Sequence, residues 1–281
     1  MKAFTPLALA LLPLALFTSA AQAQSDGRLR GTGGVSSISG ASGGGLLPWA
    51  TLTGYASHPA SSGSVFATHA DVDDYTLDVA GAGLNIRDRA EVSFARQNFD
   101  IKANGARISQ DVVGLKPRLA GDVVYERLPQ VVVGVEHHAL RDPATARAVG
   151  ARSTAGTDLY VGAARAWIDG VAGRTTLLNV NLRHSSANQY GLLGYGGDDM
   201  DERWQLEAAV AMFLTRSWVV GAEYRQKPDN LRALEEHDSW DLFLAWFPDK
   251  RVSLTAAWVN LGDIAGAPDQ SGVYLSLQGA F

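Results

Sequence analysis

The sequence predicts an all-β fold: a transmembrane antiparallel up-and-down β-barrel of about 12–14 strands that follows a cleaved signal peptide. Three observations favour it: a secretory signal, a two-residue hydrophobic period through most of the chain, and a last strand that stops on Phe281. In that strand Val273, Leu275, Leu277 and Phe281 share one face, and smaller or more polar residues occupy the other. Because successive strand side chains point to opposite faces, one face suits lipid and the other suits water.

The amino terminus has the pattern of a secretory signal peptide. Lys2 precedes an apolar run over residues 7–17, and a small-residue stretch contains Ala21 and ends at Ala23. The alternative, an amino-terminal membrane anchor, needs about 20 apolar residues, and this run is shorter. We therefore expect cleavage after Ala23, with Gln24 as the first residue of the mature chain.

Composition argues against several classes of protein. The chain has no cysteine, so it can carry neither a disulfide nor a lipid on a mature amino-terminal cysteine. Loss of Lys2 with the signal leaves 23 basic against 29 acidic residues, which moves the formal charge from -5 to -6 and argues against nucleic acid as a partner. After the signal, the apolar runs are too short for a transmembrane helix. A hydrophobic content of 46% also fits a soluble domain, so the arrangement of residues must decide.

Segments of about 9 to 13 residues alternate apolar with small or polar side chains, as strands of a membrane barrel do. Tight turns are expected at residues 87–89, 215–217 and 248–250. Long connections are expected at residues 98–108, 139–156, 185–201, 228–237 and 262–270. We assign the long connections to the cell exterior and the tight turns to the periplasm, as in other barrels of this class.

The strand count depends on a few weak segments. It is about 14 if a glycine-rich strand near residues 33–40 is included, and about 12 if two weak strands fail. The weakest region is 109–126, where Pro117 removes a hydrogen bond from the ladder. A bulge or a strand break is expected there.

Aromatic residues lie near the ends of the predicted strands. Indole and phenyl rings favour the lipid headgroup boundary, where an apolar body meets a wet edge. The alternative is a soluble β-sandwich with aromatic residues in its core, but the face opposite the apolar one holds mostly Ala, Ser, Gly and Thr rather than the polar residues of a sandwich exterior. The predicted aromatic girdle consists of Trp204, Trp218, Trp240, Trp246, Trp258 and Phe281.

Residues 31–45 are rich in glycine and serine. They lack the preceding strand, the following helix and the Lys-Ser or Lys-Thr pair of a phosphate-binding loop. Two interpretations stay open: a flexible first strand with its turn, or a segment that folds into the barrel and narrows it, because glycine lets backbones approach closely. The predicted domains are thus a signal peptide (1–23), a Gly/Ser-rich first strand or plug (24–45) and the barrel (46–281).

Three segments carry a family resemblance: GRLRGTGGVSSISG at residues 27–40, GGLLPWA within 43–50, and AEVSFARQNF at 90–99. The chain resembles an uncharacterised proteobacterial outer-membrane family, domain of unknown function 3034. The resemblance covers nearly the whole mature chain, and the first segment is its most specific part. It implies an outer-membrane barrel and supplies no substrate or catalytic residue.

The groups that could support catalysis are scattered. Neighbours in a strand point to opposite faces, so adjacent histidines cannot bind one metal ion unless a bulge intervenes. No Gly-x-Ser-x-Gly motif is present. We expect no enzymatic activity; a hydrolase at the barrel rim is the alternative. Its candidate residues are Glu136, His137 and His138 beside one loop, and His184, Ser185 and Ser186 beside another.

Two acidic clusters, residues 198–202 and 235–238, fall in predicted external loops. Carboxylates can collect divalent cations, but the spacing does not match a calcium-binding loop. We expect solvated loops, with no metal site and no cofactor.

The function favoured by the sequence is a passive channel or uptake barrel for a small solute in the outer membrane of a Gram-negative bacterium. A closed structural or adhesion barrel without a pore is the alternative. Expected partners are outer-membrane lipid and the barrel assembly machinery, which would bind the carboxyl-terminal strand ending at Phe281. Inward charges of mixed sign would give weak ion selectivity. The candidates for these lumen-facing charges are Asp78, Glu91, Arg183, Glu207, Glu223 and Arg225.

Overall fold

The computed structural model describes residues 28–57, 60–197, 203–231, 234 and 236–281. The expected signal peptide, with Ala21, Ala23 and Gln24 at its cleavage site, lies outside these residues. Among the described residues, no helix is long and apolar enough to cross a membrane.

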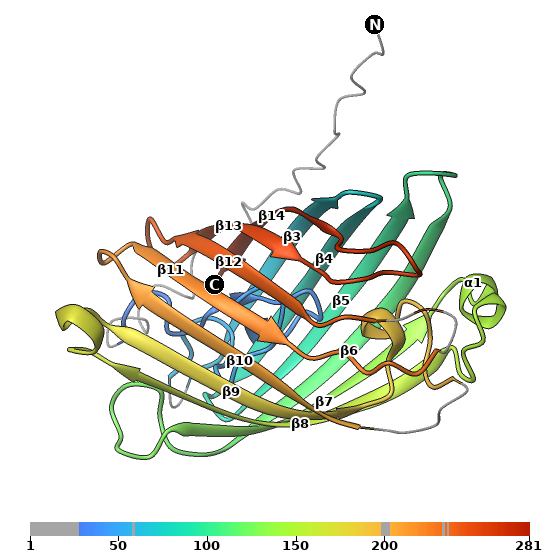
Figure 1. Ribbon diagram of the computed structural model, residues 1–281. Helices are drawn as coiled ribbons and strands as arrows, with labels where there is room; N and C mark the ends of the chain where they lie inside the picture. Colours follow the sequence, from blue (N-terminus) through green and yellow to red (C-terminus); the bar gives the residue numbers. More distant parts are fainter. Residues whose placement is uncertain (1–27, 58–59, 198–202, 232–233, 235) are drawn as a thin grey trace, which may run out of the picture.

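Twelve antiparallel strands form a closed barrel, which confirms the predicted fold class and the lower of the two expected strand counts (Figure 1). The barrel closes where β14 pairs with β3, with Gly272 opposite Val72 and Ala280 opposite Ser64. Closure leaves no unpaired strand edge. The barrel strands are β3 (Ser62–Val72), β4 (Tyr75–Ile86), β5 (Ala90–Ile101), β6 (Arg107–Ala120), β7 (Gln130–Leu140), β8 (Ala155–Trp167), β9 (Thr176–Ser185), β10 (Arg203–Phe213), β11 (Trp218–Arg225), β12 (Ser239–Trp246), β13 (Val252–Asn260) and β14 (Ser271–Ala280).

The outer surface of the barrel is apolar. In β12, buried and exposed residues alternate along the whole strand, so that Leu242 and Leu244 point outward and Asp241 and Ala245 point inward. This is the two-residue period of a strand with lipid on one side. The six aromatic residues of the predicted girdle are all exposed on the outside: Trp204, Trp218, Trp240, Trp246, Trp258 and Phe281.

Three tight turns lie at one end of the barrel, which we call the short-turn end; the two-residue turn 73–74 between β3 and β4 lies at the other end. Arg87 and Asp88 have φ of 51° and 56° and connect β4 to β5 in a tight turn. Asp249 accepts the N–H groups of Arg251 and Val252 between β12 and β13. At the opposite, long-loop end lie residues 141–154, which include the helix α1 (Ala144–Ala148), and residues 186–197, 226–231, 236–238 and 261–270. The long loop expected at 98–108 is wrong, because β5 and β6 extend further and leave only residues 102–106 between them.

The irregularity expected around Pro117 is confirmed. β6 continues through Pro117, which pairs with Ala90 of β5. On its other side, the register with β7 shifts between Arg118 and Ala120. The strand therefore accommodates the missing proline donor with a bulge rather than a break.

The glycine-rich amino-terminal segment does not form a barrel strand. Its two short strands, β1 (Val35–Ser36) and β2 (Ser42–Gly43), pair with each other and with no described barrel strand. Every residue from 33 to 54 is buried, and Figure 1 shows this segment in blue inside the barrel. We call residues 33–54 the plug. The first barrel strand begins at Ser62, so the wall begins later than the expected boundary at residue 46.

Tight packing inside the wall generates a prediction at Gly134. A Cβ at this position would collide with the ring of Tyr160, which is buried beneath the Arg183 guanidinium, 4.8 Å from its ring centroid. We expect Gly134→Ala to lower the free energy of unfolding by about 1–3 kcal/mol, because the added methyl group would overpack the core there. Urea unfolding of the folded barrel in lipid vesicles measures this.

Gly279→Ala is the matched control, since the nearest atom to its added Cβ would be 3.8 Å away. Equal unfolding midpoints for the two variants would contradict the close packing of Tyr160 on Gly134.

Candidate functional site

The plug is held by side chains of the barrel wall that bind its backbone. Glu91 on β5 accepts the N–H of Ser42 at 2.8 Å and the N–H of Thr53 at 2.6 Å. Glu223 on β11 accepts the N–H of Leu46 at 2.7 Å and the indole N–H of Trp49 at 2.6 Å. The pairing of β1 with β2 satisfies only part of the plug backbone, so its other amide groups need partners of this kind.

The plug carbonyls are bound in the same way, by donors from strands around the barrel. Because these donors lie on β5, β6, β7, β9 and β11, the plug contacts much of the circumference. The bonds run from Gln97 to the carbonyl of Ile38 (2.7 Å), from Lys116 to those of Ser42 (3.0 Å) and Trp49 (3.1 Å), from Gln130 to Ala50 (2.7 Å), from Asn181 to Pro48 (2.6 Å) and from Arg225 to Leu46 (3.3 Å).

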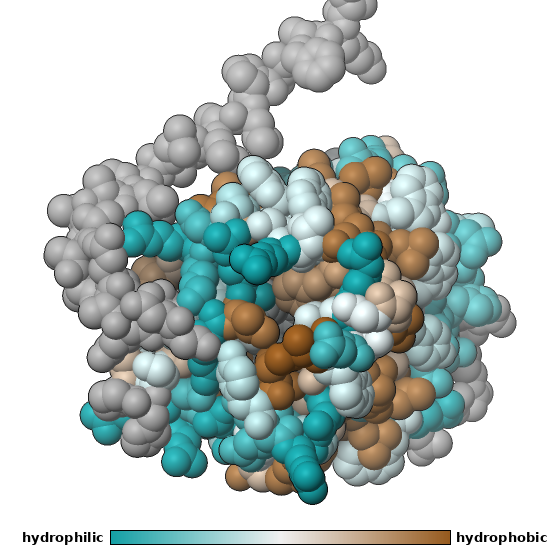
Figure 2. Space-filling model, turned by 90° about the vertical axis from the view of Figure 1, so that its left-hand side faces the viewer, coloured by the Kyte–Doolittle hydropathy of each residue, from teal (hydrophilic) through white to brown (hydrophobic). Residues whose placement is uncertain are grey.

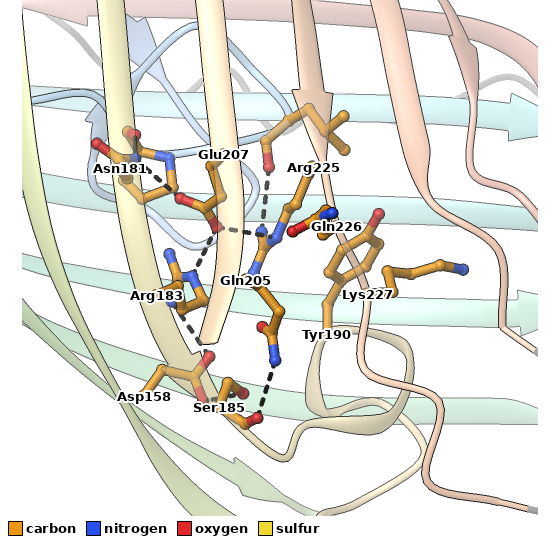
Figure 3. A network of polar contacts seen from close by, with 12 residues as sticks. Asp158, Asn181, Arg183, Ser185, Tyr190, Gln205, Glu207, Arg225, Gln226 and Lys227 are labelled. Atoms are coloured by element: carbon orange, nitrogen blue, oxygen red, sulfur yellow. Dashed lines mark hydrogen bonds and ion pairs between the residues drawn. The ribbon is translucent and has the colours of Figure 1, made fainter. Parts of the chain in front are cut away.

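Beside the plug lies a buried charge network that centres on Arg183. Its Nη1 contacts Glu136 Oε2 at 2.8 Å and Asp158 Oδ2 at 3.1 Å, and its Nε contacts Glu207 Oε1 at 2.6 Å. Arg225 Nε reaches the same Glu207 oxygen at 3.2 Å, so Glu207 lies between the two guanidinium groups (Figure 3). A fully buried charge costs free energy unless it is paired, and each of these is paired.

The plug joins this network through Ser39, whose hydroxyl donates to Glu136 Oε1 at 2.6 Å. A separate buried pair links Lys116 Nζ to Glu91 Oε1 at 3.1 Å. Between residues 33 and 54 the plug itself carries no charged side chain. All the charge near the centre of the lumen therefore belongs to the wall.

Five of the six candidate lumen charges lie inside the barrel and are almost fully buried: Glu91, Arg183, Glu207, Glu223 and Arg225. Asp78 does not. Its side chain is 51% exposed on the outer face, where it lies 2.7 Å from His69 Nδ1. The inward residues of β4 at this level are Leu77 and Val79, which pack with the other apolar side chains of the core.

Sequence reasoning did not assign five buried ionisable residues of the described barrel strands to the lumen: Lys116, Glu136, His138, Asp158 and Asp241. Lys116 lies next to Pro117, where the strand pattern was weakest, and Asp158 and Asp241 stand alone in otherwise ordinary strands. Glu136 was considered only for a catalytic rim. The two-residue period could have found Asp241, since it shares the inward face of β12 with Ser239.

A loop closes the barrel from the long-loop end. The connection between β9 and β10 contains the 3-10 turn η3 (Asn188–Gly191), and residues 187–195 are all buried. We call residues 187–195 the cap. The Tyr190 ring lies under the Arg225 guanidinium, 4.5 Å from ring centroid to Cζ, and its hydroxyl bonds to Ser239.

The buried residues Lys227 and Glu236 fix the cap to neighbouring loops. Lys227 Nζ donates to Gln189 Oε1 at 3.0 Å and to the Leu261 carbonyl at 2.8 Å. Glu236 accepts the Gln189 N–H at 3.0 Å and lies 3.8 Å from Lys227 Nζ. The expectation of a solvated cluster at 235–238 is thus wrong for Glu236; Glu235 and the other cluster, 198–202, lie outside the described residues.

The space between plug and wall is small. A mostly apolar cavity of about 20 Å³ lies among Gly44, Trp49, Phe213, Phe243 and other residues of the plug and of β9 to β12. About one water molecule fits in a space of that size. Figure 2 looks onto the short-turn end, where coloured side chains, several of them apolar, fill the middle of the barrel mouth.

The candidate catalytic residues are not assembled into a reactive set. His184 lies on the outer face, where its ring is 4.9 Å from that of Trp204, whereas Ser185 points inward and donates to Asp158 at 2.6 Å. His137 is exposed and bonds to Thr157, while His138 is buried. Adjacent residues thus diverge to opposite faces, as expected for a regular strand.

Comparisons with known proteins agree with the geometry. The family model described as "Protein of unknown function (DUF3034)" matches residues 32–278. No match is found among curated proteins.

Solved structures with a similar fold include the KdgM porin in complex with disordered oligogalacturonate, with a TM-score of 0.50 and 9% identity over 78% of this chain and 99% of that one. Omp33 of Acinetobacter baumannii has a TM-score of 0.46 and 11% identity over 78% of this chain and 98% of that one. The NanC porin has a TM-score of 0.47 and 9% identity over 78% of this chain and 98% of that one. The likeness to the KdgM porin agrees with the β-barrel fold.

The cap generates a prediction on pH. Burial raises the pKa of the Glu236 carboxyl to about 7, although Lys227 lies close by. Between the usual carboxyl pKa and about 7, the docked cap holds a proton that the undocked cap has lost. Docking should therefore weaken as the pH rises through this window, and hydrogen exchange of the cap amides, corrected for intrinsic rates, should accelerate accordingly.

Glu236→Gln keeps an acceptor for the Gln189 amide and removes the titration, so its corrected exchange should stay flat over the same pH range. A wild-type profile equally flat below pH 7 would show that Glu236 does not control the cap.

Proposed function

The chain belongs to the family described as protein of unknown function DUF3034, and we propose that it is a gated outer-membrane channel for a small polar solute. The plug closes it in the conformation described here. The observation that carries the proposal is the character of the lumen wall: it is lined with carboxylates, amides, guanidinium groups and an ammonium group that hold the plug by hydrogen bonds.

Hydrogen bonds of this kind are exchangeable. Water can replace a wall side chain on a plug amide with little net cost, whereas an apolar interface would have to be exposed to water. A wall that served only to close the barrel could fill it with its own apolar side chains. Here, instead, the wall offers polar groups to a separate segment of 22 residues, from 33 to 54. This arrangement favours a plug that can leave the lumen.

The connectivity also allows movement. The plug precedes the first barrel strand in the chain, since β3 begins at Ser62. It contributes no strand to the barrel, so its departure would break no pairing of the wall. Solutes would pass only after this step, because the inward charges are almost completely buried while the plug is in place.

The charge of the emptied lumen suggests which solutes would pass. On the described barrel strands, six buried carboxyl groups, Glu91, Glu136, Asp158, Glu207, Glu223 and Asp241, would face three buried basic side chains, Lys116, Arg183 and Arg225. An excess of one sign along a pore favours ions of the other sign. We infer that the open channel prefers cations and neutral polar solutes over anions.

A second function, a closed structural barrel, is favoured by one specific observation. The plug is buried throughout, and cap and plug meet a common apolar core that includes Leu46, Leu192 and Leu193. A plug that never leaves the lumen would have the same structure. The two functions differ in whether the plug can be displaced.

Removal of the plug separates the two functions. We expect a variant lacking residues 33–54, folded as judged by a heat-shifted gel band, to conduct steadily in planar bilayers and to show cation-selective reversal potentials. The intact protein should open rarely. A folded deletion variant that stays silent would favour the structural barrel.

A disulfide lock provides the matched test on the full chain, which has no native cysteine. A Cβ at Gly83 would lie 3.5 Å from Thr53 Cβ, which suits a disulfide. In the variant Thr53→Cys/Gly83→Cys, oxidation should abolish the rare openings, and reduction should restore them. The single variants serve as controls; openings that persist in the fully oxidised protein would mean that current does not depend on the plug.

A further inference from the structure

We propose that Glu136, His138 and Asp158 form a binding site for a divalent transition-metal ion, with Zn²⁺ as the first ion to test. The three side chains come from the neighbouring strands β7 and β8 and point into the barrel near its long-loop end. One ligand atom from each lies within 4.8 Å of the other two. The inference does not depend on the channel function proposed above.

The histidine is the residue that points to a ligand. His138 is 2% exposed, and within the described part of the chain neither of its ring nitrogens has a hydrogen-bond partner. A buried polar group without a partner costs free energy and is rare in folded proteins. Its neighbour in sequence, His137, is exposed and bonded to Thr157, so the unsatisfied ring is specific to the inward position.

The spacing suits an ion better than a direct contact. His138 Nε2 lies 3.8 Å from Asp158 Oδ2 and 4.0 Å from Glu136 Oε2, which is too long for hydrogen bonds. Metal–ligand bonds of about 2.0–2.2 Å at tetrahedral angles place ligand atoms roughly 3.4 Å apart. Movement of His138 Nε2 toward the two oxygens by about half an ångström would bring these two distances into that range.

The donor set selects the class of ion. Imidazole nitrogen is a common ligand of Zn²⁺ and its first-row neighbours, whereas Ca²⁺ and Mg²⁺ prefer oxygen ligands alone. One imidazole and two carboxylates leave a fourth position for water or another ligand. The sequence-based expectation of no metal considered His137 with His138, which diverge, and did not consider Glu136 with His138, which share a face.

Arg183 competes for the same oxygens. Its Nη1 lies 2.8 Å from Glu136 Oε2 and 3.1 Å from Asp158 Oδ2. In the connected network, three carboxylates (Glu136, Asp158 and Glu207) face two guanidinium groups (Arg183 and Arg225), so negative charge is left for a further cation. Arg183 is held at its other side by Glu207, and each carboxylate oxygen has a second lone pair for the ion.

Metal binding is measured on the full-length folded protein without a histidine tag, after chelator treatment. Zn²⁺ is added either to the folded barrel or during refolding, and retained metal is counted after dialysis. We expect one ion per chain, and a tetrahedral or five-coordinate visible spectrum when Co²⁺ replaces Zn²⁺. His138→Gln should weaken binding at least tenfold and remove that spectrum.

His137→Gln is the matched control, since it changes the adjacent histidine on the outer face, and it should leave binding and spectrum intact. Asp158→Asn should weaken binding as His138→Gln does; the heat-shifted gel band checks folding of both. No retained metal by either route would overturn the proposal. So would binding that His138→Gln leaves unchanged, which would indicate an exposed pair such as His237 and Asp263, 2.9 Å apart.

Discussion

The structure depends on one constraint: a chain segment inside a closed barrel must find partners for its backbone amide and carbonyl groups away from water and away from any sheet edge. The barrel has used its own backbone groups in the strand ladder, so wall side chains must supply the partners that the plug backbone does not provide for itself. Glu91 illustrates the solution, because its two carboxylate oxygens bind amides that lie eleven residues apart, at Ser42 and Thr53. The polar inward face of the wall follows from this requirement as well as from any contact with solute.

The buried charges of the barrel wall follow from the same need to pair the backbone groups of the plug. A carboxylate that binds plug amides brings a buried negative charge, and buried charges need counter-ions. Lys116 neutralises Glu91 and also donates to two plug carbonyls. Arg183 similarly balances Glu136 and Asp158, and Ser39 ties the plug to that pair. The position of the plug and the charges of the wall are therefore coupled, so a substitution in the wall should change how the plug is held.

The parts of the fold that sequence could predict are those set by local periodicity. The last strand, ending at Phe281, and the turns at Asp88 and Asp249 follow from alternation and turn chemistry within a few residues. Asp78 was misplaced because its inward neighbours Leu77 and Val79 are apolar, at a level where the lumen packs against apolar groups instead of a polar plug. Alternation alone does not tell which face is inside. The plug's place in the lumen and the burial of Glu236 depend on contacts between residues far apart in sequence, which no local pattern contains.

Hydrogen exchange of the plug amides in the folded barrel tests most directly whether wall side chains hold residues 33–54 inside the lumen. We expect strong protection at Ser42, Leu46, Ala50 and Thr53, whose N–H groups bind Glu91, Glu223 or Asn179. Protection should fall selectively at Ser42 and Thr53 in Glu91→Ala. Exchange of all four amides at the rate of an unstructured chain would show that the wall does not hold the plug.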